Sequence, residues 1–100
     1  MTRRELLEWL DTRHPVPPAD LRAHLAAAAT DSAEPLPQHL AGLGGALLAW
    51  VARHPAGGRE LALDLLAADA LVTYAFEAQA EADVDGLARL AQEVTIRGKA

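Results

Sequence analysis

Residues 59–83 carry a repeating pattern of apolar positions that predicts one long helix. The segment contains no Gly or Pro and is rich in Leu, Ala and Glu, which are strong helix formers. With successive side chains about 100° apart, part of the apolar set falls on one broad face, which is typical of the core face of an amphipathic helix. This expected core face consists of Leu61, Leu65, Ala68, Val72, Ala75 and Phe76.

A second, narrower apolar stripe runs along the roughly opposite side of the same segment, with polar residues along one edge. A helix that is apolar on two sides is usually enclosed by its neighbours. Either other helices of this chain cover the stripe, or the same helix of a second copy does, which makes the chain a homodimer candidate. The stripe is Leu63, Leu66, Ala70 and Tyr74, its polar edge is Asp69, Thr73 and Glu77, and together they are the candidate interface or pocket residues.

Proline, glycine and aspartate divide the rest of the chain into further helical segments. Thr2 and Glu5 have the spacing of a capping box, which predicts that a helix begins there. The expected helices run from Thr2 to before His14, from Pro18 to about Thr30, from Leu36 to His54, over residues 59–83, and from the turn at 83–86 to Gly98. The predicted fold class is therefore all-α: one domain over residues 1–100, a compact up-and-down bundle of about five helices with a long central fourth helix.

The expected third helix contains Gly42, Gly44 and Gly45, although glycine in a helix interior costs about 0.5–1 kcal/mol relative to alanine. The favoured explanation is close approach to the alanine-rich second or fourth helix, and the alternative is a break at Gly44-Gly45. The expected core stripe of this helix is Leu36, Leu40, Leu43, Leu47, Trp50 and Val51, and a separate ridge of small side chains is Gly42, Gly45, Ala49 and Ala52.

Composition and charge remove several function classes. The net charge of −5 disfavours nonspecific attraction to nucleic acid or to an anionic membrane, and we expect neither as a partner. The absence of cysteine removes disulfides and thiolate chemistry, and is consistent with a cytoplasmic protein. The apolar runs are too short for a transmembrane helix. Arginine in preference to lysine and abundant alanine favour a bacterial source.

Catalytic and metal-binding patterns are weak, and we expect no enzyme activity, no metal and no cofactor. None of the histidines has the Glu-x-x-His spacing of bundle metal sites, and Ser32, the lone serine, has no neighbouring His-and-acid pattern. His14 and His54 are expected to interact with carbonyls at helix ends, and His39 is expected to be exposed. The acidic residues Glu77, Glu81, Asp83 and Asp85 need a cationic neighbour, for which Arg3, Arg4, Arg89 and Arg97 are the candidates.

Two functions fit this pattern. The preferred one is a small, non-catalytic protein-interaction or self-association module, because the fourth helix is apolar on two sides and catalytic groups are missing. The alternative is a bundle that binds a small molecule in an aromatic-lined cavity, with Glu77 or Asp69 as the polar anchor. The aromatic residues expected around that cavity are Trp9, Trp50, Tyr74 and Phe76.

Overall fold

A computed structural model describes residues 1–99, and it describes side chains as far as residue 96. Within these residues the chain forms only helices and connecting loops, and α4 is the longest helix. The predicted fold class, an all-α bundle with a long central fourth helix, is confirmed. The helices are α1 (Arg3–Leu10), α2 (Ala19–Ala28), α3 (Leu36–Ala52), α4 (Arg59–Ala82), the short 3₁₀ helix η1 (Val84–Gly86) and α5 (Leu87–Lys99).

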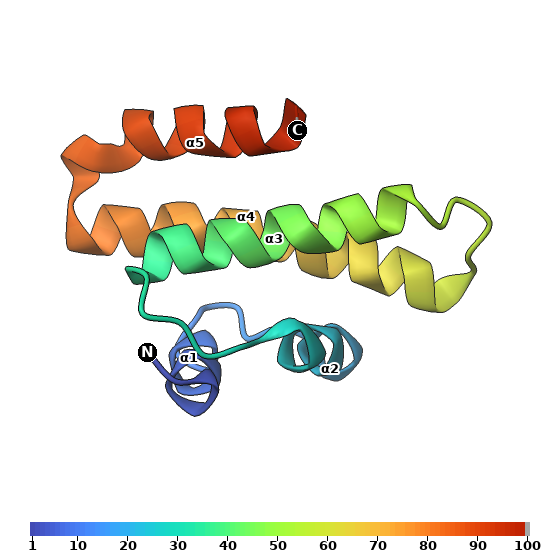
Figure 1. The fold of residues 1–100 in the computed structure, drawn as a ribbon. Coiled ribbons are helices and arrows are strands. Elements are labelled where there is room, and N and C mark those ends of the chain that lie inside the picture. The colour runs from blue at the N-terminus through green and yellow to red at the C-terminus, as the bar shows by residue number, and fades with distance from the viewer. Residues whose placement is uncertain (100) are drawn as a thin grey trace.

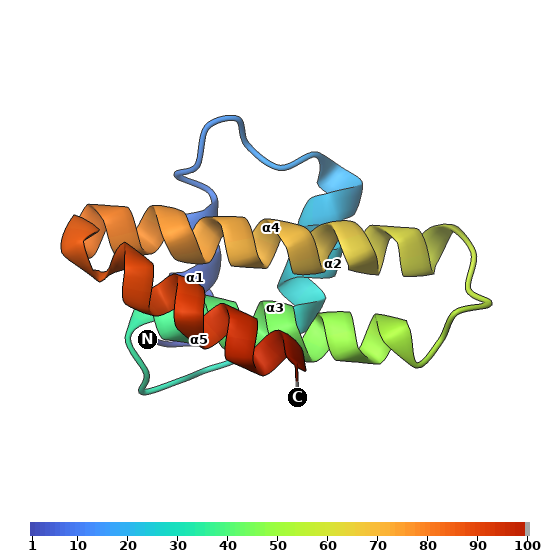
Figure 2. The ribbon, with the colours of Figure 1, turned by 90° about the horizontal axis from the view of Figure 1, so that it is seen from above.

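The helices lie in three layers, with α3 and α4 as an antiparallel pair in the middle (Figure 1). Helix α5 lies on one side of this pair, and α1 and α2 cross beneath the other side at a steep angle (Figure 2). A simple up-and-down arrangement therefore describes α3, α4 and α5 but not α1 and α2. Helix α2 has 10 residues and is about 15 Å long, so it spans the width of the α3–α4 pair rather than its length.

The helix ends follow local chemistry. The predicted capping box is confirmed: the Glu5 N–H donates to Thr2 Oγ1 at 3.2 Å, and the Thr2 N–H donates to Glu5 Oε1 at 2.8 Å. Helix α1 ends at Leu10, before the expected His14-Pro15, and the Thr12 hydroxyl donates to the Trp9 carbonyl there. Helix α5 continues through Gly98 to Lys99, so the expected end at Gly98 is wrong by one residue.

Leucine and alanine form the core, as the composition requires. The inward positions expected in α1 and α2 are confirmed, since Leu6, Leu10 and Leu25 are fully buried. In α4 the expected core face is partly wrong, because Leu65 is 48% exposed whereas Leu71 is buried. Helix α5 is about half as long as α4 and ends beside its middle, so it does not reach the N-terminal half of that face (Figures 1 and 2).

One glycine determines how closely α3 and α4 approach. A Cβ atom on Gly44 would lie 2.9 Å from Val72 Cγ2 and 3.1 Å from the Ala68 carbonyl oxygen, so only glycine fits without a shift. Helix α3 is continuous through this point, which confirms close approach to α4 and excludes the break. The separate ridge is not the contact surface, because a Cβ on Gly45 would meet nothing within 4 Å and Ala49 is exposed.

Candidate functional site: an apolar groove and two polar clusters

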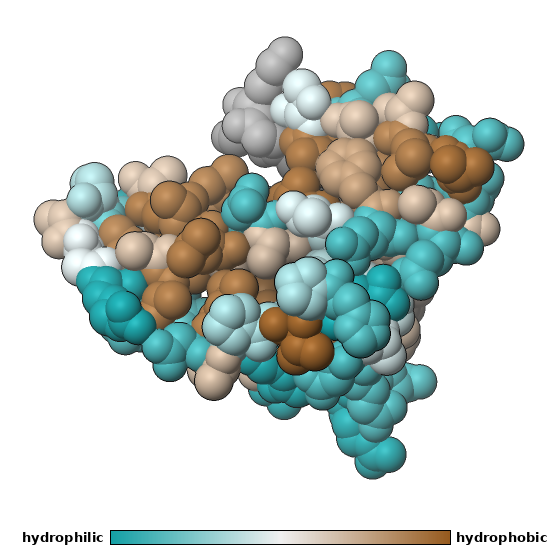
Figure 3. Space-filling model, turned by 180° about the vertical axis from the view of Figure 1, so that it is seen from behind, coloured by the Kyte–Doolittle hydropathy of each residue, from teal (hydrophilic) through white to brown (hydrophobic). Residues whose placement is uncertain are grey.

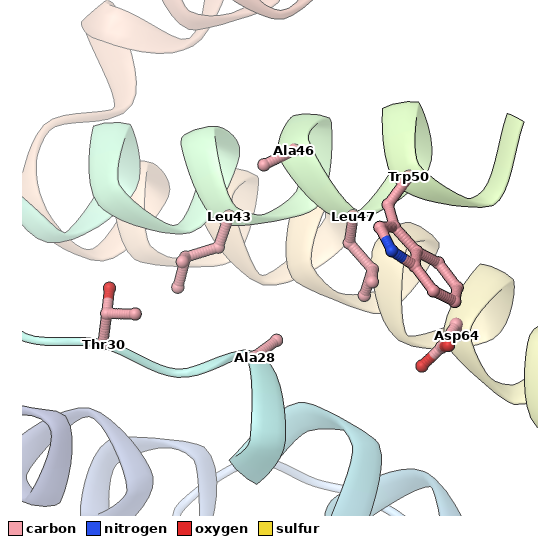
Figure 4. Close-up of a pocket in the computed structure, with 7 residues that line it drawn as sticks. All are labelled: Ala28, Thr30, Leu43, Ala46, Leu47, Trp50 and Asp64. Carbon is pink, nitrogen blue, oxygen red and sulfur yellow. The ribbon is translucent and has the colours of Figure 1, made fainter. Parts of the chain in front are cut away.

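An apolar groove of about 420 Å³ lies between the C-terminal end of α2 and one face of α3. Leu43, Leu47 and Trp50 point from α3 toward Ala28 at the end of α2, and Asp64 of α4 lies near the Trp50 ring (Figure 4). The groove stays open because α2 is short and ends in a run of alanines, which are too small to fill it. The complete lining is Ala28, Thr30, Leu43, Ala46, Leu47, Trp50 and Asp64.

Asp64 belongs to a polar cluster that joins α2 to α4. The His24 ring lies between two carboxylates: Nδ1 is 2.6 Å from Asp64 Oδ1, and Nε2 is 2.9 Å from Glu60 Oε2. The hydrogen bond to Asp64 is the main cause that raises the pKa of His24, and Glu60 adds to it. The sequence reading missed this cluster. Glu60 and Asp64 have i, i+4 spacing on α4, but nothing local places His24 opposite them.

A second polar cluster joins the end of α1 to the C-terminal half of α4. The Arg13 guanidinium lies 4.0 Å from the centre of the Trp9 ring, and its Nη1 is 2.7 Å from Glu81 Oε1 and 3.6 Å from Glu77 Oε2. Trp9 also meets Tyr74 edge to face, with 6.1 Å between ring centres. Burial, and then the negative charge of Glu77, raises the pKa of Tyr74.

The prediction of cationic partners is wrong for Glu77 and Glu81, because both carboxylates pair with Arg13. Arg3 instead donates from its side chain to the Ala26 carbonyl, and Arg4 pairs with Glu8 within α1. The pairing with Arg13 depends on the angle at which α1 crosses α4, and the periodicity of a single helix does not predict that angle. The other two expected partners are Arg89, which is exposed, and Arg97, whose side chain lies outside the described residues.

The candidate residues predicted on α4 do not gather into one pocket. Ala70 and Tyr74 pack against the core of this chain, and Leu63 lies in a small hollow beside His24, whereas Leu66 is 56% exposed. Other helices of the chain therefore cover the second stripe except at Leu66. The polar edge formed by Asp69, Thr73 and Glu77 is exposed, and the Thr73 hydroxyl donates to the Asp69 carbonyl.

The four aromatic residues expected around one cavity are divided among different places. Trp9 lines a second groove of about 370 Å³, beside Pro35, Leu36 and Glu81. Trp50 lines the first groove and stacks on His54, with 4.1 Å between ring centres. Phe76, which lies two residues beyond Tyr74 on α4, is half-buried against the core. Only Trp9 and Tyr74 of the four are in ring contact.

A helix end explains His54, and burial explains His39. His54 confirms the expectation, because its Nδ1 donates to the Trp50 carbonyl at 2.7 Å. His39 is a correction: it is buried, and its Nε2 donates to the Thr30 carbonyl at 3.0 Å, which ties the loop before α3 to that helix. His14 is exposed. No group of three or more His, Asp or Glu side chains within the described residues is arranged to hold a metal ion.

Apolar side chains are also exposed outside the groove. Leu65 and Leu66 lie in the N-terminal half of α4 and Leu48 in the C-terminal half of α3, so all three belong to the hairpin end that α5 does not reach. The view from behind shows apolar surface over this end of the molecule (Figure 3). None of the helices within residues 1–99 combines the length and the apolar character needed to cross a bilayer.

Comparisons with known proteins do not identify a family. No protein-family model, no curated protein and no solved structure matches this chain.

Proposed function

We propose that this chain is a non-catalytic protein-interaction module whose groove between α2 and α3 binds an amphipathic helix of a partner protein. The observation that carries the proposal is the lining, in which three large apolar side chains stand in a row on α3 and face Ala28 and Thr30 across the groove. A partner helix would place apolar side chains at i, i+3 or i+4 spacing against Leu43, Leu47 and Trp50. We also propose, from composition, that the protein is cytoplasmic and bacterial.

Charge complementarity specifies the partner further. Asp64 lies at the same end of the groove as the Trp50 ring, and Glu60 lies one turn before it on α4. A carboxylate and an indole both attract a cation. We therefore infer that the partner helix carries Lys or Arg at the end that lies beside Trp50, which also agrees with the net charge of −5 on this chain.

The test is a selection of binders from a library of helical peptides, displayed against the folded wild-type protein. Ala46→Glu places a charge in the groove, and Ala49→Glu is the matched control, because both alanines are exposed on α3 but only Ala46 lines the groove. We expect apolar peptides with a basic end, at least tenfold weaker binding to Ala46→Glu, and unchanged binding to Ala49→Glu. Failure to find peptides with this dependence contradicts the proposal.

Sedimentation equilibrium of the wild type and the same two variants distinguishes self-association from binding of a different partner protein. A second copy is the competing occupant, because Leu48, Leu65 and Leu66 are exposed on the same hairpin. A wild-type dimer that becomes a monomer with Ala46→Glu identifies a second copy as the occupant and overturns the choice of a different partner. A monomer mass for the wild type and for both variants supports a different partner protein.

A small-molecule site is the second candidate, and the contact between Trp9 and Tyr74 favours placing it in the second groove. The volume of about 370 Å³ is in the range of ligand sites, and Arg13 and Glu81 supply charges beside the Trp9 ring. The polar anchor proposed there is Glu81, which lines this groove, whereas Glu77 and Asp69 do not line it. A fragment screen by NMR tests this candidate, and fragments that shift the Trp9 indole signal but not the Trp50 indole signal support it.

A further inference from the structure

His24 occupies a position that a neutral imidazole cannot fully satisfy. Both of its ring nitrogens are within hydrogen-bond distance of a carboxylate oxygen, Nδ1 of Asp64 and Nε2 of Glu60. A carboxylate oxygen accepts a hydrogen bond but does not donate one. Only the doubly protonated ring donates to both partners, because the neutral ring presents a lone pair to one of them. The geometry therefore fits the imidazolium form.

We propose that His24 is a pH-dependent latch that fastens α2 to the first turns of α4, closed when the ring carries both protons and open at Glu60 when it loses one. Glu60 is the partner that moves, because its side chain is 80% exposed and water replaces the lost contact. The Asp64 side chain is 22% exposed and lies beside the groove. The neutral ring therefore keeps its one proton on Nδ1 and continues to donate it to Asp64.

The charges around His24 favour the closed form. Glu60 and Asp64 face the ring from α4, and Asp20 of α2 lines the same hollow but is paired with Arg59 of α4 at 2.7 Å. On the other side of Asp64, α3 contributes the apolar groove wall with Leu47 and Trp50. Negative charge thus exceeds positive charge near the ring. The raised pKa of His24 agrees with this balance and moves the transition to higher pH.

Opening of the latch is a local event that reaches the groove. Leu25, the next residue on α2, is fully buried and holds the helix on the core whether or not His24 is charged. Ala28, one turn after His24, forms part of the groove wall. A looser α2 would therefore widen or reshape the groove without unfolding the bundle. The latch itself concerns the free protein and does not depend on what the groove binds.

The test uses NMR titration of the imidazole signals in the free protein. We expect a His24 pKa above the ordinary histidine value of about 6.5, a large decrease of this pKa in Asp64→Asn, and a smaller decrease in Glu60→Gln. Arg59→Gln is the control of opposite sign, because it leaves Asp20 unpaired in the hollow without removing a ring partner, so any change in the His24 pKa should be an increase. A His24 pKa at or below that ordinary value overturns the proposal.

Amide hydrogen exchange then tests whether α2 responds. The quantity to compare is the ratio of α2 to α3 amide exchange rates, each corrected for the intrinsic rate. This ratio is expected to be several-fold higher at about pH 8.5 than at about pH 5.5. His24→Gln should remove this pH dependence, and His14→Gln should preserve it. Equal relative protection of α2 at both pH values in wild type contradicts the latch. Neither result depends on a ligand, so failure of the groove proposal leaves this test intact.

Discussion

Two links of similar design join the α1–α2 layer to α4, and they differ in the cation that each one uses. Near the C-terminal end of α4, Arg13 lies between Glu77 and Glu81, whereas near its N-terminal end His24 lies between Glu60 and Asp64. Arginine stays charged at every physiological pH, but histidine titrates. The same arrangement of one cation and two carboxylates therefore gives a permanent link at one end and an adjustable link at the other.

The surroundings of the two links strengthen this difference. The Arg13 guanidinium stacks on Trp9, so an apolar contact and a cation–π contact hold it as well as the carboxylates. His24 lies beside a groove that is open to solvent. Motion of the α1–α2 layer is therefore expected at the α2 end and not at the α1 end. Four predictions test this comparison, beginning with the largest effect.

The largest effect is expected when the apolar contact that holds α2 on the core is reduced. Leu25→Ala removes a fully buried side chain of α2 and should lower the free energy of unfolding by about 3 kcal/mol. The reason is that burial of leucine, rather than either polar link, holds α2 on the core. Urea denaturation monitored by circular dichroism measures this change. A loss smaller than that of Arg13→Gln would show that the polar links dominate.

Replacement of the permanent link should have a moderate effect that does not depend on pH. Arg13→Gln removes the cation from Trp9 and from two carboxylates that are about half exposed, and should cost about 1 kcal/mol of stability. The same loss is expected at pH values from about 5 to about 8, since arginine stays charged throughout. Arg13→Lys is the control for charge without the planar contact. A loss that varies over this pH range would contradict a permanent link.

Replacement of the adjustable link should have an effect that depends on pH. Because the folded-state pKa of His24 is raised, its stabilising contribution is fully present below the unfolded pKa of about 6.5 and is lost as pH rises through the folded pKa. The difference in unfolding temperature between wild type and His24→Gln should therefore be largest in mild acid and shrink at alkaline pH. Differential scanning calorimetry across this range measures it, and a difference that grows with pH has the wrong sign.

The smallest effect is expected from the ion pair next to the latch. Arg59 and Asp20 are largely exposed, and exposed pairs contribute little. Arg59→Gln should change the free energy of unfolding by no more than about 0.5 kcal/mol. Chemical denaturation in low and high salt checks this value. A larger, salt-sensitive loss would place Arg59 in the latch rather than beside it.

The sequence alone predicted the helices, the capping box of the first helix and much of the inward face of the N-terminal helices. The capping box of Thr2 and Glu5 and the burial of Leu6 and Leu25 follow from interactions within one segment. The same reasoning predicted that a glycine in α3 allows close approach to another helix. These features are local, because a helix fixes which of its own side chains share a face before it meets any neighbour.

The tertiary structure decided which face meets which neighbour. Leu71 is buried where α4 meets Gly44 of α3, and Leu65 is exposed in the half of α4 that the short α5 does not reach. Helix periodicity also did not predict that His24 would stand between Glu60 and Asp64, since the partners are more than thirty residues away from it in sequence. Helix length, crossing angle and register together place such distant residues, and each depends on several segments packing at once.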